Sequence, residues 1–150
     1  MALKLEKRSP LTAADGLIQL VGVPGFFTKV TGAKESFKRA KFFDGLTLVE
    51  RSTGSSASTV SDVTLERSFD PKEDGSLIDY VNTAKCAVEA STITLRFIRR
   101  CNGEHTELGL LTLSGCRLTE FEYPEIDSAA SDKAMMLKLS FSVEQLTWGN

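Results

Sequence analysis

Apolar and polar residues alternate most regularly near the C-terminus of this chain. In "MMLKLSFSVEQLTW" (135–148), every second side chain is apolar over five positions, namely Met135, Leu137, Leu139, Phe141 and Val143. Most of the side chains between them are polar or charged. Because successive residues of a β-strand point to opposite faces, this period of two predicts a strand with one buried and one solvated face. Burial on one face is typical of an antiparallel sheet.

The same period of two recurs in several other segments. Residues 63–68 and 91–100 each read as one strand, and residues 106–124 read as one long strand or as two that divide at Gly115. "GVPG" (22–25) divides residues 17–30 into two short strands, and Asp44-Gly45 favours a hairpin between residues 33–43 and 46–52. Polar stretches at 53–59 and 124–133 are expected to be loops, and "NGEH" (102–105) is expected to be a turn with His105 on a loop.

One segment departs from the strand pattern and predicts a short helix. Asp70 is placed as its N-cap, Pro71 as its first residue and Glu73 as the partner in a capping box. Leu77, Ile78 and Val81 then form an apolar face, with Tyr80 beside them. Gly75 is expected to weaken the helix by about 1 kcal/mol relative to alanine, so packing on a sheet must hold it.

These segments together predict a mainly β fold. Seven or eight strands and one helix indicate two packed antiparallel sheets, as in a β-sandwich or barrel. The length of 150 residues suits one domain. We expect a single β domain over residues 17–150, preceded by an N-terminal arm over residues 1–16.

Composition and charge exclude several classes of protein. The formal net charge is −2, which gives no general attraction to nucleic acid or to an anionic membrane. No secretory signal and no stretch of membrane-spanning length is apparent, so we expect a soluble cytoplasmic product without a membrane anchor. Basic residues outnumber acidic ones by eight to five in residues 1–50, and acidic residues outnumber basic ones by eight to three in residues 101–150. This asymmetry suits surfaces that meet between neighbouring molecules.

Candidate catalytic and ligand-binding groups are sparse. With one histidine, His105, a nucleophile–histidine system has a single candidate base, and no phosphate-binding or metallohydrolase motif is present. Three cysteines do not close a disulfide framework, and Cys101 with His105 lacks the paired spacing of a zinc site. Four carboxylates lie close together in the sequence and could in principle supply a glycosidase-like pair: Glu120, Glu122, Glu125 and Asp127. On the outward face of a strand, however, such acids are usually solvated. "RFIRR" (96–100) is expected to be a solvated strand end rather than a specific nucleic-acid site. We therefore expect no catalytic residue, no cofactor and no metal.

The order of these features resembles the tail tube proteins of contractile bacteriophage tails. The matching stretches, which cover residues 17–147, are "GFFTKVTG" (25–32), "FFDG" (42–45), "VTLERSFDPKEDGSLIDYV" (63–81) and "LSGCRLTEFEYPEIDSAASDKAMMLKLSFSVEQL" (113–146). The chain departs from the family at Ser68, where glycine is common, and at Tyr80-Val81, where tryptophan is common. These departures leave the related tubes of tailocins, extracellular contractile injection systems and type VI secretion systems as alternatives.

The resemblance implies a structural role. Six copies would form a ring, and stacked rings would form a hollow tube inside a contractile sheath. Partners would be further copies, the sheath, baseplate and tail terminator proteins, and a tape measure protein and DNA in the lumen without sequence-specific binding. The location would be the virion tail, after synthesis in the host cytoplasm. Arg67, Asp79 and Tyr80 are the candidate contacts between subunits.

Two functions of other classes stay open from the residues alone. A monomeric β-sandwich that binds a carbohydrate or a peptide would expose aromatic side chains around one cleft. A hydrolase would use Glu120, Glu122 or Asp127, and it would lose activity when one of these carboxylates is replaced.

Overall fold

The structure is a computed structural model that describes residues 8, 10–46, 48–52, 54 and 57–149. The described residues form one helix, α1 (Gly75–Ala84), and eleven strands. The strands are β1 (Gly16–Leu20), β2 (Lys29–Thr31), β3 (Glu35–Lys38), β4 (Lys41–Asp44), β5 (Val49–Ser52), β6 (Ala57–Val60), β7 (Val63–Ser68), β8 (Ser91–Cys101), β9 (Glu104–Glu122), β10 (Met136–Ser142) and β11 (Gln145–Gly149). The expectation of a mainly β fold with one short helix is confirmed.

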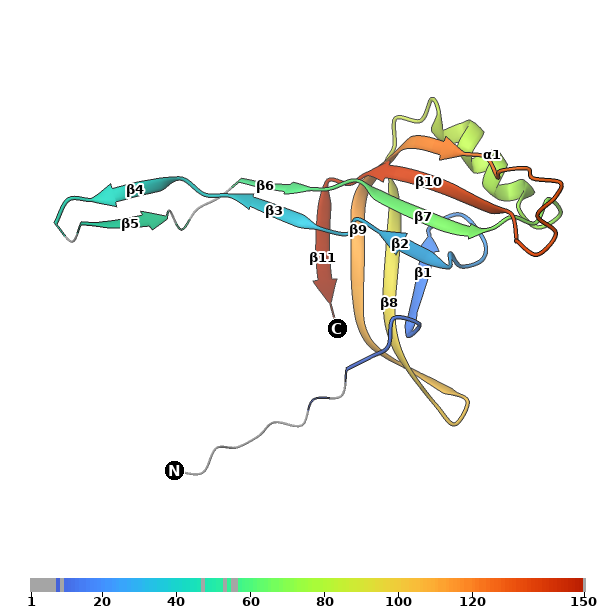
Figure 1. Cartoon of the computed structure of the whole chain (residues 1–150), viewed down its shortest axis with the longest axis horizontal. Coiled ribbons are helices and arrows are strands. Elements are labelled where there is room, and N and C mark those ends of the chain that lie inside the picture. Colours follow the sequence, from blue (N-terminus) through green and yellow to red (C-terminus); the bar gives the residue numbers. More distant parts are fainter. Residues whose placement is uncertain (1–7, 9, 47, 53, 55–56, 150) are drawn as a thin grey trace.

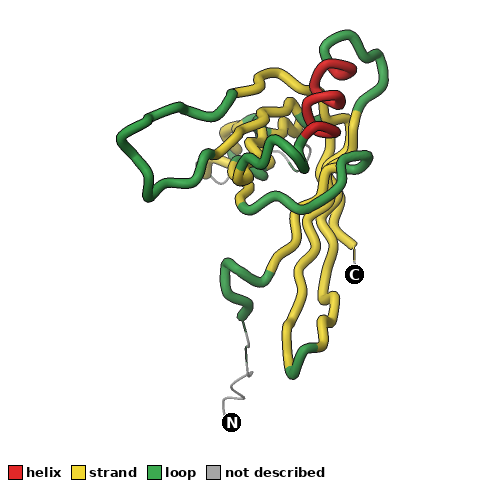
Figure 2. The backbone as a smooth tube through the Cα atoms, turned by 90° about the vertical axis from the view of Figure 1, so that its right-hand side faces the viewer, coloured by secondary structure: helices red, strands yellow, loops and turns green. Residues whose placement is uncertain are grey.

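Seven strands form one antiparallel sheet that is folded over on itself. Its order is β1-β8-β9-β10-β7-β2. Strand β11 also pairs with β9, at residues 110–114, which precede the part of β9 that pairs with β10. The first half of β9 therefore lies between β8 and β11, whereas its last residues pair with β10. Figures 1 and 2 show β8 and β9 running almost perpendicular to β7 and β10. The two expected sheets are thus two halves of one sheet, joined through β9.

The bend in β9 lies at Gly115. The pairing of β9 with β8 shifts register here, because Leu113 pairs with Ile93 whereas Cys116 pairs with Ser91. Gly115 has a φ of 67°, a backbone conformation that glycine adopts without strain. A β-bulge of this kind lets one strand of 19 residues serve both halves of the sheet.

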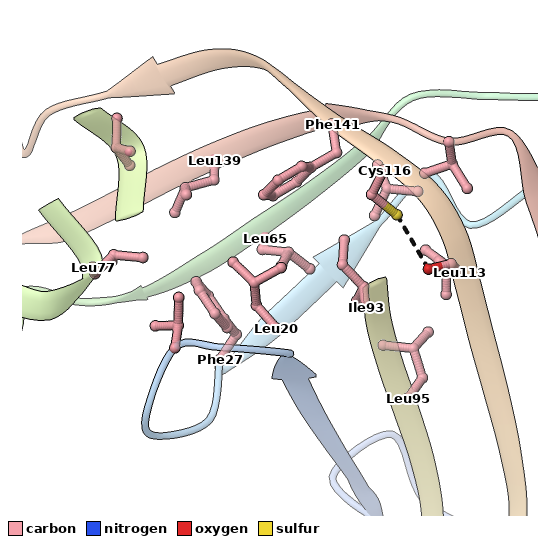
Figure 3. Packing of buried hydrophobic residues seen from close by; sticks show 14 of the residues in the cluster. Leu20, Phe27, Leu65, Leu77, Ile93, Leu95, Leu113, Cys116, Leu139 and Phe141 are labelled. Carbon is pink, nitrogen blue, oxygen red and sulfur yellow. Dashed lines mark hydrogen bonds between the residues drawn. The ribbon is translucent and has the colours of Figure 1, made fainter. Parts of the chain in front are cut away.

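The core lies between the two halves of the sheet and beside the helix (Figure 3). Strand β7 buries Val63, Leu65 and Arg67, which confirms the predicted alternation. The largest fully buried apolar side chains come from both halves and from α1: Phe141, Leu20, Leu65, Leu77, Ile93, Leu113, Leu137 and Leu139. The helix contributes Leu77 and Val81, while Ile78 is only partly buried.

The predicted start of the helix is wrong. Helix α1 begins at Gly75 and its N-cap is Asp74, whose side chain makes no capping hydrogen bond. Asp70 instead starts a preceding turn, in which its Oδ1 accepts a hydrogen bond from the Lys72 N–H and its carbonyl accepts one from the Asp74 N–H. Because Gly75 lies at the first helical position, the expected loss of stability for a glycine in a helix interior does not apply.

Three smaller expectations are also corrected. His105 lies in β9 rather than on a loop, since Asn102 and Gly103 alone form the turn, with φ of 50° and 78°. A loop was expected at residues 53–59, but residues 57–59 belong to strand β6, which ends at Val60. The C-terminal strand divides at Val143 and Glu144 into β10 and β11, because the chain crosses there from one half of the sheet to the other. Met135 precedes β10 and is 44% exposed.

A long hairpin, which we call the arm (residues 33–60), projects from the body of the molecule (Figure 1). Strand β3 pairs with β6 at its base, and β4 pairs with β5 at its tip. The chain leaves the body at Gly32, where a Cβ atom would lie 2.2 Å from the Asp62 carbonyl oxygen. The hairpin predicted at Asp44-Gly45 is therefore confirmed, and it is the tip of a much longer ribbon.

Candidate assembly surfaces

Arg67 connects three elements inside the body. Its Nη2 donates to Asp74 Oδ1 at the start of α1, and its Nη1 donates to the Pro24 carbonyl oxygen at 3.0 Å. The guanidinium carbon lies 5.1 Å from the centroid of the Phe27 ring, within the range of a cation–π contact. Asp74 Oδ2 accepts a hydrogen bond from the Asp70 N–H at 2.8 Å. Strand β7, the loop before β2 and the turn before α1 are thereby held together.

The three residues predicted from the sequence as subunit contacts lie in different surroundings. Arg67 is 7% exposed and its partners belong to its own chain. Asp79 lies on the exposed side of α1. Tyr80 is partly buried against the core, and its hydroxyl forms a hydrogen bond with the Ser91 hydroxyl. Burial raises the pKa of the Tyr80 hydroxyl, and the hydrogen bond with Ser91 acts against that rise.

Two edge strands bound the half of the sheet made by β1, β8, β9 and β11. Strand β11 pairs with β9 through Gln145–Gly149, and the described residues place no strand on its other side. Strand β1 pairs with β8, and its outer edge is covered at one point, where the Ile18 carbonyl oxygen accepts from the Phe27 N–H at 2.8 Å. Exposed strand edges are ready sites for pairing with another chain.

The face of this half that points away from the core carries two polar rows, and the next row along the strands brings together Leu17, Arg96 and Leu110. Gln19, Thr94, Thr112 and Thr147 lie opposite one another across β1, β8, β9 and β11 and form one row. Ser114 and Gln145 form the neighbouring pair. Among the charges near these rows, Arg96 is paired with Glu107 at 4.0 Å. These polar residues come from four strands that are far apart in the sequence, and only the register between the strands aligns them.

The arm exposes apolar side chains that a soluble domain normally buries. Phe37, Phe42 and Phe43 are 55%, 51% and 65% exposed, and Leu46 is 97% exposed. The arm also carries five basic and three acidic residues. Phe42 and Phe43 are successive residues of β4, so they point to opposite faces, and each face of the arm exposes an aromatic ring.

At the opposite end of the molecule lies a surface hollow of about 370 Å³, formed by β7, the end of β9, β10 and the loop between β9 and β10. Its charged lining residues are Glu66, Glu122, Glu125, Asp127, Lys133 and Lys138. Lys138 Nζ lies 3.5 Å from Glu66 Oε1, so the charges of these two side chains largely cancel each other. The predicted carboxylates Glu122, Glu125 and Asp127 are thus brought together, whereas Glu120 faces outward along β9.

The thiols and the single histidine are the remaining reactive side chains considered from the sequence. Cys101 and His105 lie on the same hairpin, but no group of three metal-ligating side chains gathers among the described residues. Cys86 and Cys101 are exposed thiols, and Cys116 is a buried one. No helix within the described ranges is long and apolar enough to cross a membrane.

No protein-family model and no curated protein matches this chain. Solved structures do match across almost its whole length. The tube-terminating cap of the anti-feeding prophage is 16% identical with a TM-score of 0.75, and the match covers 98% of this chain and 95% of that one. A sheath/tube terminator of the PVC extracellular contractile injection system is 20% identical with a TM-score of 0.74, over 95% of this chain and 99% of that one.

A further match lies in the sheath–tube complex of the PVC system, with 18% identity and a TM-score of 0.73 over 93% of this chain and 91% of that one. A type six secretion system protein is similar at a lower TM-score of 0.55, with 12% identity over 91% of this chain and 83% of that one. The chain therefore has the fold of tube-type proteins of contractile injection systems. The resemblance predicted from the sequence is confirmed at the level of the fold.

Proposed function

We propose that this chain, whose fold is that of tube and terminator proteins of contractile injection systems, is a self-assembling structural subunit of such an apparatus. Copies would join head to tail into rings of six, and rings would stack into a hollow tube. It is not an enzyme in this proposal. The observation that carries the proposal is the half-sheet β1-β8-β9-β11, which ends in an edge at β11 and in an edge at β1 that is bridged at Ile18.

Strand direction makes this half-sheet suitable for closing into a barrel. Each of its three internal pairings is antiparallel, so strand direction alternates from β1 to β11. With four strands per copy, β11 of one copy and β1 of the next also run in opposite directions. Pairing between copies would then continue the same antiparallel pattern. A head-to-tail contact of this type closes into a ring when the rotation between copies allows it.

The outward face of the half-sheet suits the wall of a lumen. Its rows of threonine, serine and glutamine side chains can bind water and carry no charge, and the nearby Arg96 is paired with Glu107. A passing chain then meets few strong electrostatic contacts, so DNA, a tape measure protein or an ejected protein would slide without specific binding. We therefore assign the face with Gln19, Thr94, Thr112 and Thr147 to the lumen.

The outer parts of the subunit would contact other proteins. Asp79 is exposed on α1 and is retained as a candidate contact, while Arg67 and Tyr80 hold in place the helix that carries it. Structures of similar proteins have been solved in a sheath–tube complex and in a six-fold symmetrised baseplate. Sheath, baseplate and terminator proteins are accordingly the proposed partners.

The TM-scores of these structures support a narrower proposal about the type of apparatus. Similar chains from extracellular contractile injection systems and the anti-feeding prophage have TM-scores of 0.69 to 0.75. We favour a phage-like injection system or a contractile phage tail over a type VI secretion system, for which the TM-score given above is lower, at 0.55. A terminator function is the second candidate, because two of the similar structures are caps or terminators.

Negative-stain electron microscopy of the purified chain, together with its mass in solution, tests the proposal. A tube subunit would give six-fold rings that grow into hollow tubes, alone or on a baseplate-capped tail fragment added as a seed. A terminator would give single rings that do not grow. A chain that stays monomeric at high concentration with the seed present would overturn the proposal and favour a monomeric ligand-binding sandwich.

A further inference from the structure

The backbone groups on the outer edge of strand β1 can be assigned from the hydrogen bonds at its two ends. Successive residues of a strand direct their N–H and C=O groups alternately to one side and to the other. The Asp15 carbonyl oxygen faces β8, because it accepts from the Ile98 N–H at 3.2 Å. The Val21 N–H also faces β8, because it donates to the Thr92 carbonyl oxygen at 3.0 Å. The residues of β1 that direct their backbone groups away from β8 are therefore Gly16, Ile18 and Leu20.

Two of these three residues already use their carbonyl oxygens within the chain. The Ile18 carbonyl oxygen accepts from the Phe27 N–H at 2.8 Å, and that of Leu20 accepts from the Val23 N–H at 3.1 Å. Phe27 and Val23 are 4% and 2% exposed, so packing in the core holds both donors in place. Among the described residues, none donates a hydrogen bond to the outward carbonyl oxygen of Gly16.

We propose that these two internal hydrogen bonds set the register in which the next copy of the chain joins. The inference rests on the proposed self-assembly, in which β11 of one copy pairs with β1 of the next. An incoming strand finds both a donor and an acceptor at Gly16, whereas the acceptors of Ile18 and Leu20 are occupied. It is therefore displaced along β1 toward Gly16. Without this displacement its Thr147 would lie opposite Gln19 and simply continue the row of polar side chains.

The two faces of the sheet restrict the size of this displacement. A slip by a single residue would turn every side chain of the incoming strand to the other face, so that Thr147 would leave the polar face. The smallest displacement that keeps the faces continuous places Thr147 opposite Leu17 and Trp148 opposite Gly16. A larger one would bring the strand against the turn at Thr12–Asp15, where the chain is no longer extended.

This displacement has a consequence for the closure of a ring. A sheet closes into a barrel only when its strands are tilted and its register is staggered by a fixed amount. The same displacement at every contact between copies adds a stagger that always has the same direction. A contact between Thr147 and Gln19 would add none. The buried Phe27 and Val23 amides thereby influence the shape of the assembly without touching the neighbouring copy.

Disulfide trapping between copies tests the register, in a background without the exposed thiols (C86S/C101S). The variant L17C/T147C places thiols at the two positions proposed to lie opposite each other, and Q19C/T147C is the matched control. Leu17 and Gln19 both direct their backbone groups toward β8, so each is a non-hydrogen-bonded position at the contact. Cα atoms at such positions lie about 4.5 Å apart, within the range of a disulfide. Strands β8 and β9 separate the two thiols within one copy, so a disulfide can form only between copies.

The oxidised assemblies are compared by non-reducing gel electrophoresis. L17C/T147C should give a ladder of covalent oligomers that ends at the size of the ring, and Q19C/T147C should lose this ladder. An equimolar mixture of the single variants L17C and T147C, which changes one site in each copy, should give covalent dimers. Circular dichroism and electron microscopy check that every variant folds and forms rings.

The remaining outcomes separate the register from the proposed function. If Q19C/T147C forms rings and cross-links as efficiently as L17C/T147C, or more so, the register is wrong and the proposed function survives. If rings form but neither pair cross-links, the register is also wrong. A wild-type chain that forms no ring, even on the seed, overturns both proposals.

Discussion

Arg67 and Asp74 form a buried ion pair that joins strand β7 to the start of helix α1. Their side chains are 8% and 5% exposed, and each also bonds the backbone of a neighbouring segment. Two charges removed from water are tolerated when they are paired and hydrogen-bonded, and these contacts satisfy most of the pair's polar atoms, although Arg67 Nε is buried without a partner. The pair therefore ties the helix, the β7 strand and the Pro24–Phe27 loop into one unit.

Removing one member of this pair should destabilise the monomer strongly. Asp74→Ala should lower the free energy of unfolding by about 3–5 kcal/mol, because the buried Arg67 charge is left without its partner. The double variant Arg67→Met with Asp74→Ala should lose less than the sum of the two single variants, since it buries no unpaired charge. Urea denaturation of the unassembled chain measures each value.

The neighbouring acid supplies the control for that prediction. Glu73 lies in the same turn and is exposed, so Glu73→Ala should change the free energy of unfolding by less than about 0.5 kcal/mol. Equal losses for Glu73→Ala and Asp74→Ala would contradict the role given to the pair.

The buried thiol of Cys116 should make stability depend on alkaline pH. Burial raises the pKa of this thiol from 9.0 to about 11, and its S–H donates to the Leu113 carbonyl oxygen at 3.2 Å. The unfolded chain loses the proton at a lower pH than the folded chain. This contribution to stability is therefore complete below about pH 9 and is lost as the pH rises toward 11.

Two measurements check the behaviour of Cys116. The unfolding midpoint of the wild type in urea should fall between pH 9 and 11, and Cys116→Ala should remove part of that fall. At pH 8 a thiol reagent should modify Cys86 and Cys101 in the folded chain, whereas Cys116 should react only on unfolding. Rapid modification of all three thiols in the native protein would show that Cys116 is accessible.

Gly109 should control the position of the single tryptophan. A Cβ atom on Gly109 would lie 2.5 Å from the Trp148 ring, which packs against Phe97 with centroids 5.3 Å apart. Gly109→Ala should displace the ring, shift its fluorescence to longer wavelength and cost about 0.5–1.5 kcal/mol, the contribution of an aromatic pair. Gly149→Ala, which meets nothing within 4 Å, should leave the spectrum unchanged.

Gly32 should be needed where the chain leaves the body for the arm. Its φ is 90°, and an added Cβ would meet the Asp62 backbone, which has little freedom to move. Gly32→Ala should therefore cost about 1–3 kcal/mol or more in thermal or chemical unfolding. Gly45→Ala at the tip of the arm, where the space is open, is the matched control. A neutral Gly32→Ala would mean that the root of the arm can shift.

Deleting the first ten residues should separate ring formation from stacking. The turn at Thr12–Asp15 then stays, and with it the Asp15 carbonyl oxygen that accepts from the Ile98 N–H at 3.2 Å. We propose that these residues help to join stacked rings, so we expect folded subunits that still form rings but give shorter tubes by electron microscopy. Wild-type tube lengths after the deletion would remove this segment from the mechanism.

The sequence by itself determined the local structure wherever one periodicity dominated. Alternation along residues 63–68 and 136–142 identified both strands and their buried faces, because a side-chain period of two follows from the strand backbone alone. The apolar face of α1 at Leu77 and Val81 was predicted for the same reason with a helical period. The family resemblance, carried by the order of these features, predicted the fold.

Tertiary structure decided what local preference leaves open. Asp70 and Glu73 match the sequence pattern of a capping box. In the structure, however, the Asp74 carboxylate is buried against Arg67, and the helix begins at Gly75. The division between β10 and β11, the row of hydroxyls across four strands and the hollow opposite the arm each depend on long-range register. Contacts between residues distant in sequence set these features, and no short window of the chain contains both partners.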